Sequence, residues 1–333
     1  MNLLIEVKTV VSKLDQTSRK WKRLLTIVTA VLTLVYCSTC LFLFVRQRHL
    51  IYRPASELSL KPDAPDFNLP YEDVWIPISG AQTRLHGWWI PAAKKQENFV
   101  ILPDEPSNIL TSPKVMLYLC GVGRNMGDYN YLARVSAFQQ LGFSVLVFDY
   151  RGYGLSEGDF PHELQVYEDG QAAWQYLRDV RQIPPEQIFI YGESLGGAIA
   201  LDLAINHPEA GGLIMQSSFT SMAEAISHKT LLQIFPINLL LSQRFDSLSK
   251  IQSLKVPVLF LHGKSDSVVP AEMSQRLYDA AAGPKQLFMI SGADHVRIYQ
   301  PGEQSYLKAI QKFVELTEQQ NTSPLTISMP PID

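Results

Sequence analysis

Ser194 is the central residue of a Gly-x-Ser-x-Gly sequence that separates a short apolar run, ending at Tyr191, from an apolar segment of helical length. Glycines at the two outer positions, Gly192 and Gly196, permit the close backbone approach of a sharp strand-to-helix turn. The N-terminus of the following helix favours negative charge that develops beside the serine. We therefore predict that Ser194 is a nucleophile. The structural alternative is a glycine-rich turn in which the serine caps the helix.

A serine hydroxyl is a poor nucleophile at neutral pH, so it needs a general base, and the base needs an acceptor that orients it. When the serine comes first in the chain, the expected order is an acid and then a histidine, each after a strand. Asp266 follows the apolar run at 256–262, and His295 follows the last such run, at 286–290. We predict Asp266 as the orienting acid and His295 as the base.

Other histidines and aspartates compete for these two roles. The remaining histidines lie before the core strands, at helix ends or between strands: His49, His86, His162, His207, His228 and His262. None of them follows the last strand, and we expect His262 to pack or form hydrogen bonds at a strand end. Asp294 would rarely point at the ring of its own neighbour, His295. Asp149 lies at the end of a strand that comes too early in the chain.

Two backbone N–H groups are needed to bind an oxyanion, one from the residue after the nucleophile and one from the loop after an early strand. The first is expected from Leu195. The second is expected in the stretch Cys-Gly-Val-Gly at 120–123, and we choose Val122. An ordinary glycine turn is compatible with the same residues.

The elements that must position these groups are short apolar runs alternating with amphipathic segments of helical length. The runs are 115–120, 144–149, 188–191, 212–216, 256–262 and 286–290, and the helical segments are 130–141, 165–179, 195–206, 271–281 and 303–316. Runs that are apolar on both faces are typical of buried parallel strands. The predicted fold class is therefore α/β, a mostly parallel sheet with helices on both sides. Two strands at 73–78 and 85–91 are expected to pair at its edge.

The segment 24–45 contains 22 residues without a formal charge. A helix of that length is about 33 Å long, and the hydrocarbon core of a bilayer is about 30 Å thick. A cleaved signal sequence would have a shorter apolar run ending in small residues, so we predict an uncleaved transmembrane helix and a single-pass membrane protein. Six basic residues precede the segment and three follow it, at positions 46, 48 and 53. This bias predicts a cytoplasmic N-terminus, with the rest of the chain on the opposite side.

The net charge is −3, with 29 basic and 32 acidic residues, so no global field favours nucleic acid, and we exclude nucleic-acid binding. Cys37, Cys40 and Cys120 do not form a disulfide framework, and no second cysteine or histidine pair completes a zinc site. We predict neither a metal nor a cofactor.

Five parts are expected along the chain: a basic segment at 1–23, the transmembrane helix at 24–45, a proline-containing connector at 46–71, the catalytic domain at 72–316 and a disordered tail at 317–333. The polar stretch 92–113 is expected to be a surface excursion. Residues from about 218 to 250 overrun a simple crossover, and we expect them to form a small cap. Its apolar residues either line an acyl pocket or pack on the sheet as core.

Several further motifs appear in order: Leu-Ile-Tyr-Arg-Pro at 50–54, Phe-Asp-Tyr-Arg-Gly-Tyr-Gly-Leu-Ser at 148–156, Ser-Phe-Thr-Ser-Met at 218–222, Arg-Phe-Asp-Ser at 244–247 and Val-Pro-Val-Leu at 256–259. With the serine motif and His295, they make residues 50–316 resemble the α/β-hydrolase superfamily. The resemblance is to its membrane-tethered branch, which includes depalmitoylases and lysophospholipase-like hydrolases. The family commonly has His-Gly-Asn where this chain has Cys-Gly-Val at 120–122, and the excursion at 92–113 is longer than usual.

The resemblance and the apolar segment together predict a membrane-anchored serine hydrolase that cleaves an acyl ester or thioester, lipid-like in character, through an acyl-enzyme. Its expected partners are the lipid bilayer and that substrate. A serine peptidase or amidase would use the same three residues, and a non-catalytic binding scaffold is a third reading. An acyltransferase would share the acyl-enzyme.

Overall fold

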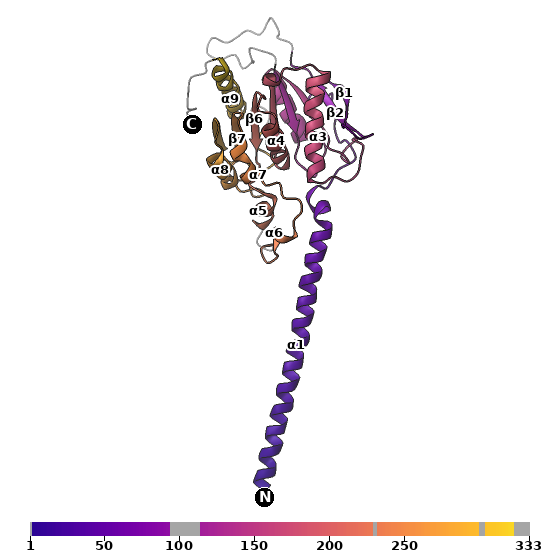
Figure 1. The fold of residues 1–333 in the computed structure, drawn as a ribbon, viewed down its shortest axis with the longest axis vertical. Coiled ribbons are helices and arrows are strands. Elements are labelled where there is room, and N and C mark those ends of the chain that lie inside the picture. Colours follow the sequence, from indigo (N-terminus) through magenta and orange to yellow (C-terminus); the bar gives the residue numbers. More distant parts are fainter. Residues whose placement is uncertain (1, 94–113, 229–231, 300–303, 323–333) are drawn as a thin grey trace. The chain divides into compact units, whose positions relative to one another are not determined.

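The computed structural model describes residues 2–93, 114–228, 232–299 and 304–322 (Figure 1). It divides into two compact units. The first comprises Met1–Gln47 with Asn238–Ser242, and the second comprises Arg48–Ile237 with Gln243–Asp333. Most of the predicted excursion, residues 94–113, lies outside the described residues.

Helix α1 runs without a break from Asn2 to Ile51, and all but its last four residues belong to the first unit. Its stretch Asp15–Ile51 has a mean hydropathy of 2.2 in its most apolar window, and none of that window is buried. Among the described residues, this is the one helix that is long and apolar enough to cross a membrane. Within the same unit, the Gln47 side chain donates to the Leu240 carbonyl (3.1 Å) and accepts the Ser242 N–H (2.7 Å).

Helix α1 extends beyond the predicted transmembrane segment at both ends. The expected basic segment is helical from Asn2, and the helix continues into the expected connector as far as Ile51. The reason is local, because lysine, arginine, leucine and glutamine are good helix formers and no proline occurs before Pro54.

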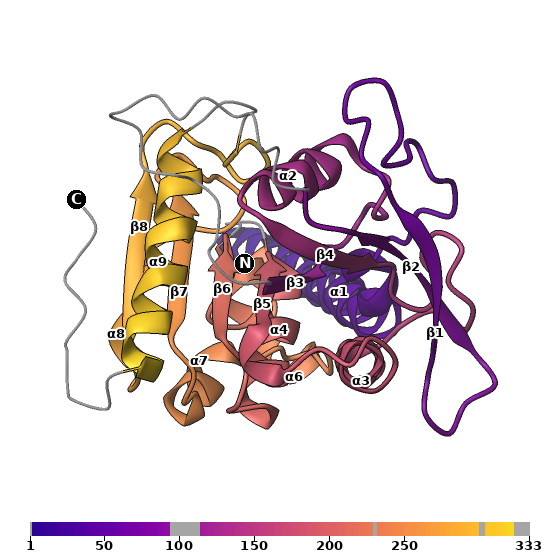
Figure 2. The same ribbon diagram turned by 90° about the horizontal axis from the view of Figure 1, so that it is seen from above.

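The second unit is organised around one sheet of eight strands in the order β1-β2-β4-β3-β5-β6-β7-β8, seen from above in Figure 2. The strands are β1 (Glu72–Pro77), β2 (Arg84–Ile90), β3 (Lys114–Leu119), β4 (Phe143–Phe148), β5 (Ile188–Glu193), β6 (Gly212–Gln216), β7 (Val258–Gly263) and β8 (Lys285–Ile290). The pairs β1–β2 and β2–β4 are antiparallel, and every other pair is parallel. The predicted α/β class and the antiparallel edge pair are confirmed.

The strands at the centre of the sheet end level with one another. Leu119 of β3 is in register with Gly192 of β5, and Glu193 of β5 is in register with Gln216 of β6. Gln216 is in turn in register with Leu261 of β7. Loops that leave these strands therefore start from a common edge, which is where ligands bind in open α/β sheets.

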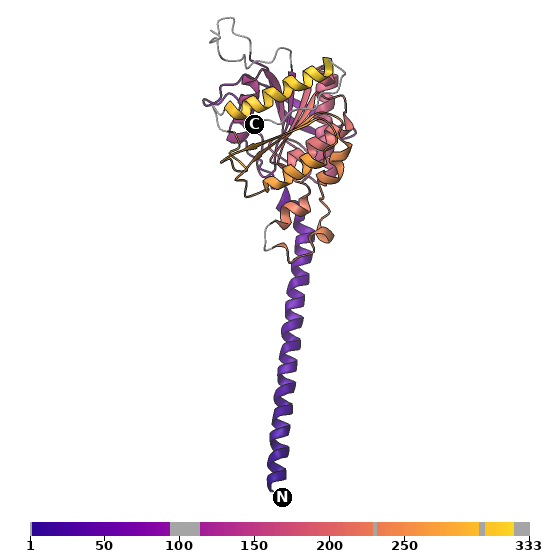
Figure 3. The same ribbon diagram turned by 90° about the vertical axis from the view of Figure 1, so that its left-hand side faces the viewer.

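Helices cover both faces of the sheet. The core on one face includes residues of α2 (Tyr129–Gln140) and α9 (Gln304–Thr322), packed against strand residues such as Tyr118. The opposite face carries α3 (Glu163–Gln175), α4 (Leu195–Asn206) and α8 (Ala271–Ala280). Figure 3 shows α8 and α9 on opposite sides of the strands. Side chains alternate accordingly: Tyr118 stacks edge-on against Phe138 of α2, whereas Leu119 lies beside Gly170 of α3.

The predicted cap contains three short helices, α5 (Met222–Ser227), α6 (Ile237–Leu240) and α7 (Ser247–Lys250), and its residues 229–231 lie outside the described part. The predicted disordered tail began at Thr317, but α9 continues to Thr322. Thr317 is 2% exposed, so its side chain is buried and extends the packed face of α9. Residues 323–333 lie outside the described residues.

Candidate active site

Ser194 lies between β5 and α4 with φ 53° and ψ −118°, a conformation that non-glycine residues rarely adopt. Its N–H donates to the Gln216 carbonyl at 2.8 Å, which ties the turn to β6. A Cβ atom on Gly196 would lie 2.2 Å from the Leu119 carbonyl oxygen, and one on Gly192 would lie 2.3 Å from the Gly196 carbonyl oxygen. The turn therefore requires glycine at both of the positions that the sequence singled out.

The three residues predicted for catalysis form one hydrogen-bonded chain. His295 Nε2 lies 3.2 Å from Ser194 Oγ, and His295 Nδ1 lies 2.7 Å from Asp266 Oδ2. A histidine that donates its Nδ1–H to the carboxylate presents the Nε2 lone pair to the serine hydroxyl. The other carboxylate oxygen of Asp266 accepts the N–H groups of Val268 and Val269, both at 2.8 Å.

The environment of Asp266 favours its ionised form. Burial alone would raise the pKa of this carboxyl, but hydrogen bonds from His262 and His295 hold the pKa well below its usual range. An ionised Asp266 can accept the Nδ1–H of His295, and it would stabilise an imidazolium if His295 took up a proton.

His262 was expected to pack or form hydrogen bonds at a strand end, and its position beside the acid was not foreseen. Its side chain is fully buried, with Nε2 3.0 Å from the Val269 carbonyl and 3.2 Å from Asp266 Oδ2. Its Nδ1 lies 2.6 Å from the hydroxyl of Ser274. The sequence signal that could have predicted this contact is the spacing, because His262 lies four residues before Asp266.

The predicted oxyanion loop lies next to the nucleophile. A Cβ atom on Gly121 would lie 3.6 Å from the Cβ of Ser194 and 3.1 Å from the hydroxyl of Tyr131. Leu195 is the first residue of α4, where N–H groups have no partner within the helix. Val122 is half-buried, beside Gly121. The use of the Leu195 and Val122 N–H groups as oxyanion donors stays a prediction.

Comparison with known proteins agrees with this architecture. The family profile described as serine aminopeptidase, S33, matches residues 111–253. An uncharacterized protein of Mycobacterium tuberculosis strain H37Rv is 34% identical over 271 residues, which cover 80% of this chain and 87% of that protein. The alpha/beta hydrolase domain-containing protein WAV2 of Arabidopsis thaliana is 28% identical, over 74% of this chain and 80% of its own. The chain belongs to the α/β-hydrolase superfamily.

Solved structures share the fold of this α/β-hydrolase. An esterase of Pyrococcus furiosus superposes with a TM-score of 0.62 at 20% identity, over 80% of this chain and 98% of its own. The structure of Est1E from Butyrivibrio proteoclasticus with ferulic acid bound is also similar, with a TM-score of 0.54 at 18% identity, over 75% of this chain and 100% of its own.

A buried ion pair beneath the serine turn of the α/β-hydrolase was not foreseen from the sequence. Arg134 of α2 is 1% exposed, and its Nη2 lies 2.6 Å from Glu193 Oε2. The Tyr118 hydroxyl donates to the same oxygen at 2.8 Å and accepts from Arg134 Nε at 2.9 Å. Arg134 Nη1 also donates to the Val296 carbonyl at 3.4 Å. One guanidinium thus links Glu193, the residue before Ser194, to Val296, the residue after His295.

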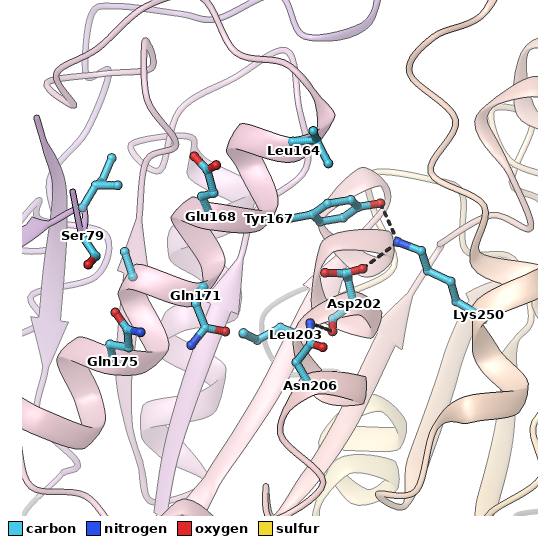
Figure 4. Close-up of a pocket in the computed structure, with 12 residues that line it drawn as sticks. Ser79, Leu164, Tyr167, Glu168, Gln171, Gln175, Asp202, Leu203, Asn206 and Lys250 are labelled. Atoms are coloured by element: carbon cyan, nitrogen blue, oxygen red, sulfur yellow. Dashed lines mark hydrogen bonds and ion pairs between the residues drawn. The ribbon is translucent and has the colours of Figure 1, made fainter. Parts of the chain in front are cut away.

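The structure also contains a cavity of about 570 Å³ on the α3 and α4 side of the sheet (Figure 4). Lys250 is one of the residues that line it, and its Nζ pairs with Asp202 Oδ1 at 2.6 Å and donates to the Tyr167 hydroxyl at 3.3 Å. None of Ser194, Asp266 and His295 lines this cavity, so it is separate from the hydrogen-bonded chain described above. Among the described residues, no group of three or more His, Cys, Asp or Glu side chains could hold a metal ion.

Proposed function

We propose that this hydrolase is anchored in a membrane by α1 and cleaves the ester or thioester of a lipid-like acyl group through an acyl-enzyme on Ser194. The observation that carries the proposal is the continuous chain from Asp266 through His295 to the Ser194 hydroxyl, with distances of 2.7 and 3.2 Å. A nucleophile, a base and an orienting carboxylate in hydrogen-bond reach are the requirements of acyl transfer.

Acylation begins when Ser194 Oγ attacks the substrate carbonyl carbon and its proton passes to His295 Nε2. Asp266 stabilises the imidazolium, and the N–H groups of Leu195 and Val122 bind the oxyanion of the tetrahedral intermediate. The intermediate collapses as the bond to the leaving group breaks, and His295 donates its proton to the departing alkoxide or thiolate. The acyl group is now an ester of Ser194.

Deacylation repeats these steps with water as the nucleophile. His295 takes a proton from the water as its oxygen attacks the acyl carbon. When the second tetrahedral intermediate collapses, the bond to Ser194 Oγ breaks and His295 returns the proton to that oxygen. The carboxylic acid leaves, and the enzyme is regenerated.

A lipid-like substrate is supported by the apolar character of three regions. None of the window of α1 with mean hydropathy 2.2 is buried. Val268 is 43% exposed and Val296 is 39% exposed, two residues after the acid and one residue after the base. Ile234 in the cap is 67% exposed. Apolar side chains beside a catalytic group favour an acyl chain over a charged substrate.

The test uses the full-length protein in detergent with a fluorophosphonate probe and a panel of p-nitrophenyl esters and acyl thioesters of increasing chain length. Wild type and a Ser136→Ala control, which removes a hydroxyl on α2, should be labelled and active. Ser194→Ala should lose labelling and at least about 10³-fold in hydrolysis. A folded wild-type protein that neither labels nor hydrolyses any ester would contradict the proposal and revive the scaffold reading.

A serine aminopeptidase is the second candidate, because the matching family profile carries that description. An aminopeptidase needs a carboxylate free to bind the substrate amine. Glu224 of the cap region is instead paired with Arg276 at 2.5 Å and accepts the Thr220 hydroxyl at 2.7 Å. Hydrolysis of aminoacyl p-nitroanilides that exceeds hydrolysis of acyl esters in kcat/KM would favour this candidate over the esterase.

A further inference from the structure

The oxyanion loop, residues 120–127, lies along a second segment, residues 52–60, which follows α1 in the chain. The Gly123 N–H donates to the Tyr52 carbonyl at 3.0 Å. Near the other end, the Leu60 N–H donates to the Gly127 carbonyl at 3.1 Å. The approach is so close that a Cβ atom on Gly127 would lie 2.7 Å from the Leu60 carbonyl oxygen. Both halves of the loop are therefore bound to the segment 52–60.

Asn125 joins the two segments between these backbone bonds. Its side chain is buried, at 3% exposure. The amide nitrogen Nδ2 donates to the Ala55 carbonyl at 3.1 Å and to the Glu57 carbonyl at 2.6 Å. The amide oxygen accepts the Gly127 N–H at 3.1 Å. Both polar atoms of this side chain are thus used: Nδ2 bonds the segment 52–60, and Oδ1 bonds a backbone N–H within the loop.

The opposite side of the loop is held by the end of β4. Asp149 Oδ1 accepts the Met126 N–H at 2.7 Å, and the Tyr150 hydroxyl donates to the Cys120 carbonyl at 3.0 Å. The Gly154 N–H donates to the Ala55 carbonyl at 2.9 Å. This carbonyl therefore accepts hydrogen bonds both from Asn125 of the loop and from the segment that follows β4. The loop is therefore clamped, although it contains neither helix nor strand.

We propose that Asn125 is a positioning residue, which fixes the oxyanion loop on the segment 52–60 and so holds the Val122 N–H toward the oxyanion. The inference rests on the proposed function, since it concerns the same reaction. An N–H group on a loop stabilises a transition state only when it is preorganised, and the loss of one such donor costs about 10²–10³-fold in kcat. Asn125 lies three residues from Val122 and does not touch the nucleophile, base or acid, so its effect must pass through the loop.

The test compares full-length Asn125→Asp with wild type in detergent, using the p-nitrophenyl ester that wild type cleaves best. Aspartate has nearly the same shape as asparagine, but it replaces the donor Nδ2 with a carboxylate oxygen that would face the Ala55 and Glu57 carbonyl oxygens. We expect kcat to fall about 10²-fold while KM stays within about 3-fold, the pattern of a lost transition-state interaction. The pH profile of kcat/KM should keep its midpoint, because His295 and Asp266 are untouched. Asn206→Asp is the matched control, since Asn206 Nδ2 also donates to a backbone carbonyl, that of Asp202, at the end of α4.

A second variant, Gly127→Ala, pushes the loop away from Leu60 without a change of charge, and it should show the same loss in kcat. Wild-type kcat in a folded Asn125→Asp protein would overturn the inference, as would a shifted pH midpoint. Loss of cooperative unfolding in both variants would also overturn it, because Asn125 would then hold the fold as a whole. A wild-type protein without esterase activity would instead refute the proposed function.

Discussion

Asp149 and Asp266 are both buried carboxyls in loops that leave the same edge of the sheet, yet their surroundings shift their pKa values in opposite directions. Asp266 is surrounded by donors, and its pKa is held well below the usual range despite burial. Burial raises the pKa of Asp149 to about 7, against one hydrogen bond from the Met126 N–H that lowers it. Within the described part of the chain, Asp149 Oδ2 has no hydrogen-bond partner. These surroundings fit Asp266, rather than Asp149, for the role of a permanent anion.

The protonation of Asp149 should make stability depend on pH. A carboxyl with a pKa of about 7 in the folded protein and about 3.9 in the unfolded chain binds its proton more tightly when folded, so its contribution is lost as pH rises toward 7. The ceiling is roughly 4 kcal/mol, since one pKa unit corresponds to about 1.4 kcal/mol. Asp149→Asn stays neutral, so its melting temperature should rise relative to that of wild type between about pH 4 and 7, and the difference should stay constant at higher pH. A difference in melting temperature between the two proteins that does not change with pH would contradict this assignment. Asp169, whose pKa burial also raises, is present in both proteins and cancels.

The Arg134–Glu193 pair makes a second prediction at the residue scale. Removal of one partner of a buried ion pair leaves an uncompensated charge and costs about 3–5 kcal/mol. Arg134→Met should therefore destabilise the protein strongly, and Arg134→Met with Glu193→Gln should destabilise it less. Denaturant unfolding of wild type, both single variants and the double variant measures the coupling. Additive losses would show that the two side chains do not depend on each other.

At the scale of elements, the site depends on how closely α4 approaches the end of β3. Gly196→Ala would force a Cβ atom to within 2.2 Å of the Leu119 carbonyl oxygen, where backbone cannot yield easily. We expect a loss of about 1–3 kcal/mol in stability and loss of fluorophosphonate labelling, because the Ser194 turn must shift.

Gly170→Ala in α3 is the matched control for that variant. A Cβ atom there would lie 3.3 Å from Leu119 Cδ2 and 3.4 Å from Ile199 Cγ2, both side-chain atoms that can move. Alanine also gains about 1 kcal/mol in helix propensity, so the melting temperature and labelling should stay close to wild type. If Gly196→Ala and Gly170→Ala lose the same amount of stability and labelling, the close approach of α4 to β3 is not the reason for the effect of Gly196→Ala.

The elements and the catalytic candidates were predictable where the signal was local. Apolar runs placed the strands to within about two residues, and the residues Ser194, Asp266 and His295 each follow one of those runs. The contact of Arg134 with Glu193 was not predictable, because the two residues lie on different elements and nothing in either segment marks the pair. The end of α9 was missed for the same reason: Thr317 continues the helix because it is buried by tertiary contacts, although its own segment is polar.

At the scale of the whole molecule, the apolar stretch of α1 predicts a single-pass protein, and the excess of basic residues before it predicts a cytoplasmic N-terminus. In sealed vesicles whose cytoplasmic face is outward, added protease should remove the basic N-terminal residues and leave the hydrolase domain intact until detergent is added. The chain should also stay in the membrane fraction after alkaline carbonate extraction. Digestion of the hydrolase domain before detergent is added would show the opposite orientation. Release of the chain by carbonate would argue against a membrane-spanning helix.

The chain separations in the hydrogen-bonded triad have a consequence for biosynthesis. His295 lies 101 residues from Ser194 and 29 residues from Asp266 along the sequence. Contacts between distant residues form slowly, because the loop-closure entropy must be overcome before they contribute. Under the proposed mechanism, a nascent chain that has exposed Ser194 but not yet β8 and the loop after it lacks the base, so it should be inactive. Reactivity toward a serine probe therefore reports completed folding, and it can time the maturation of the newly made protein in a cell.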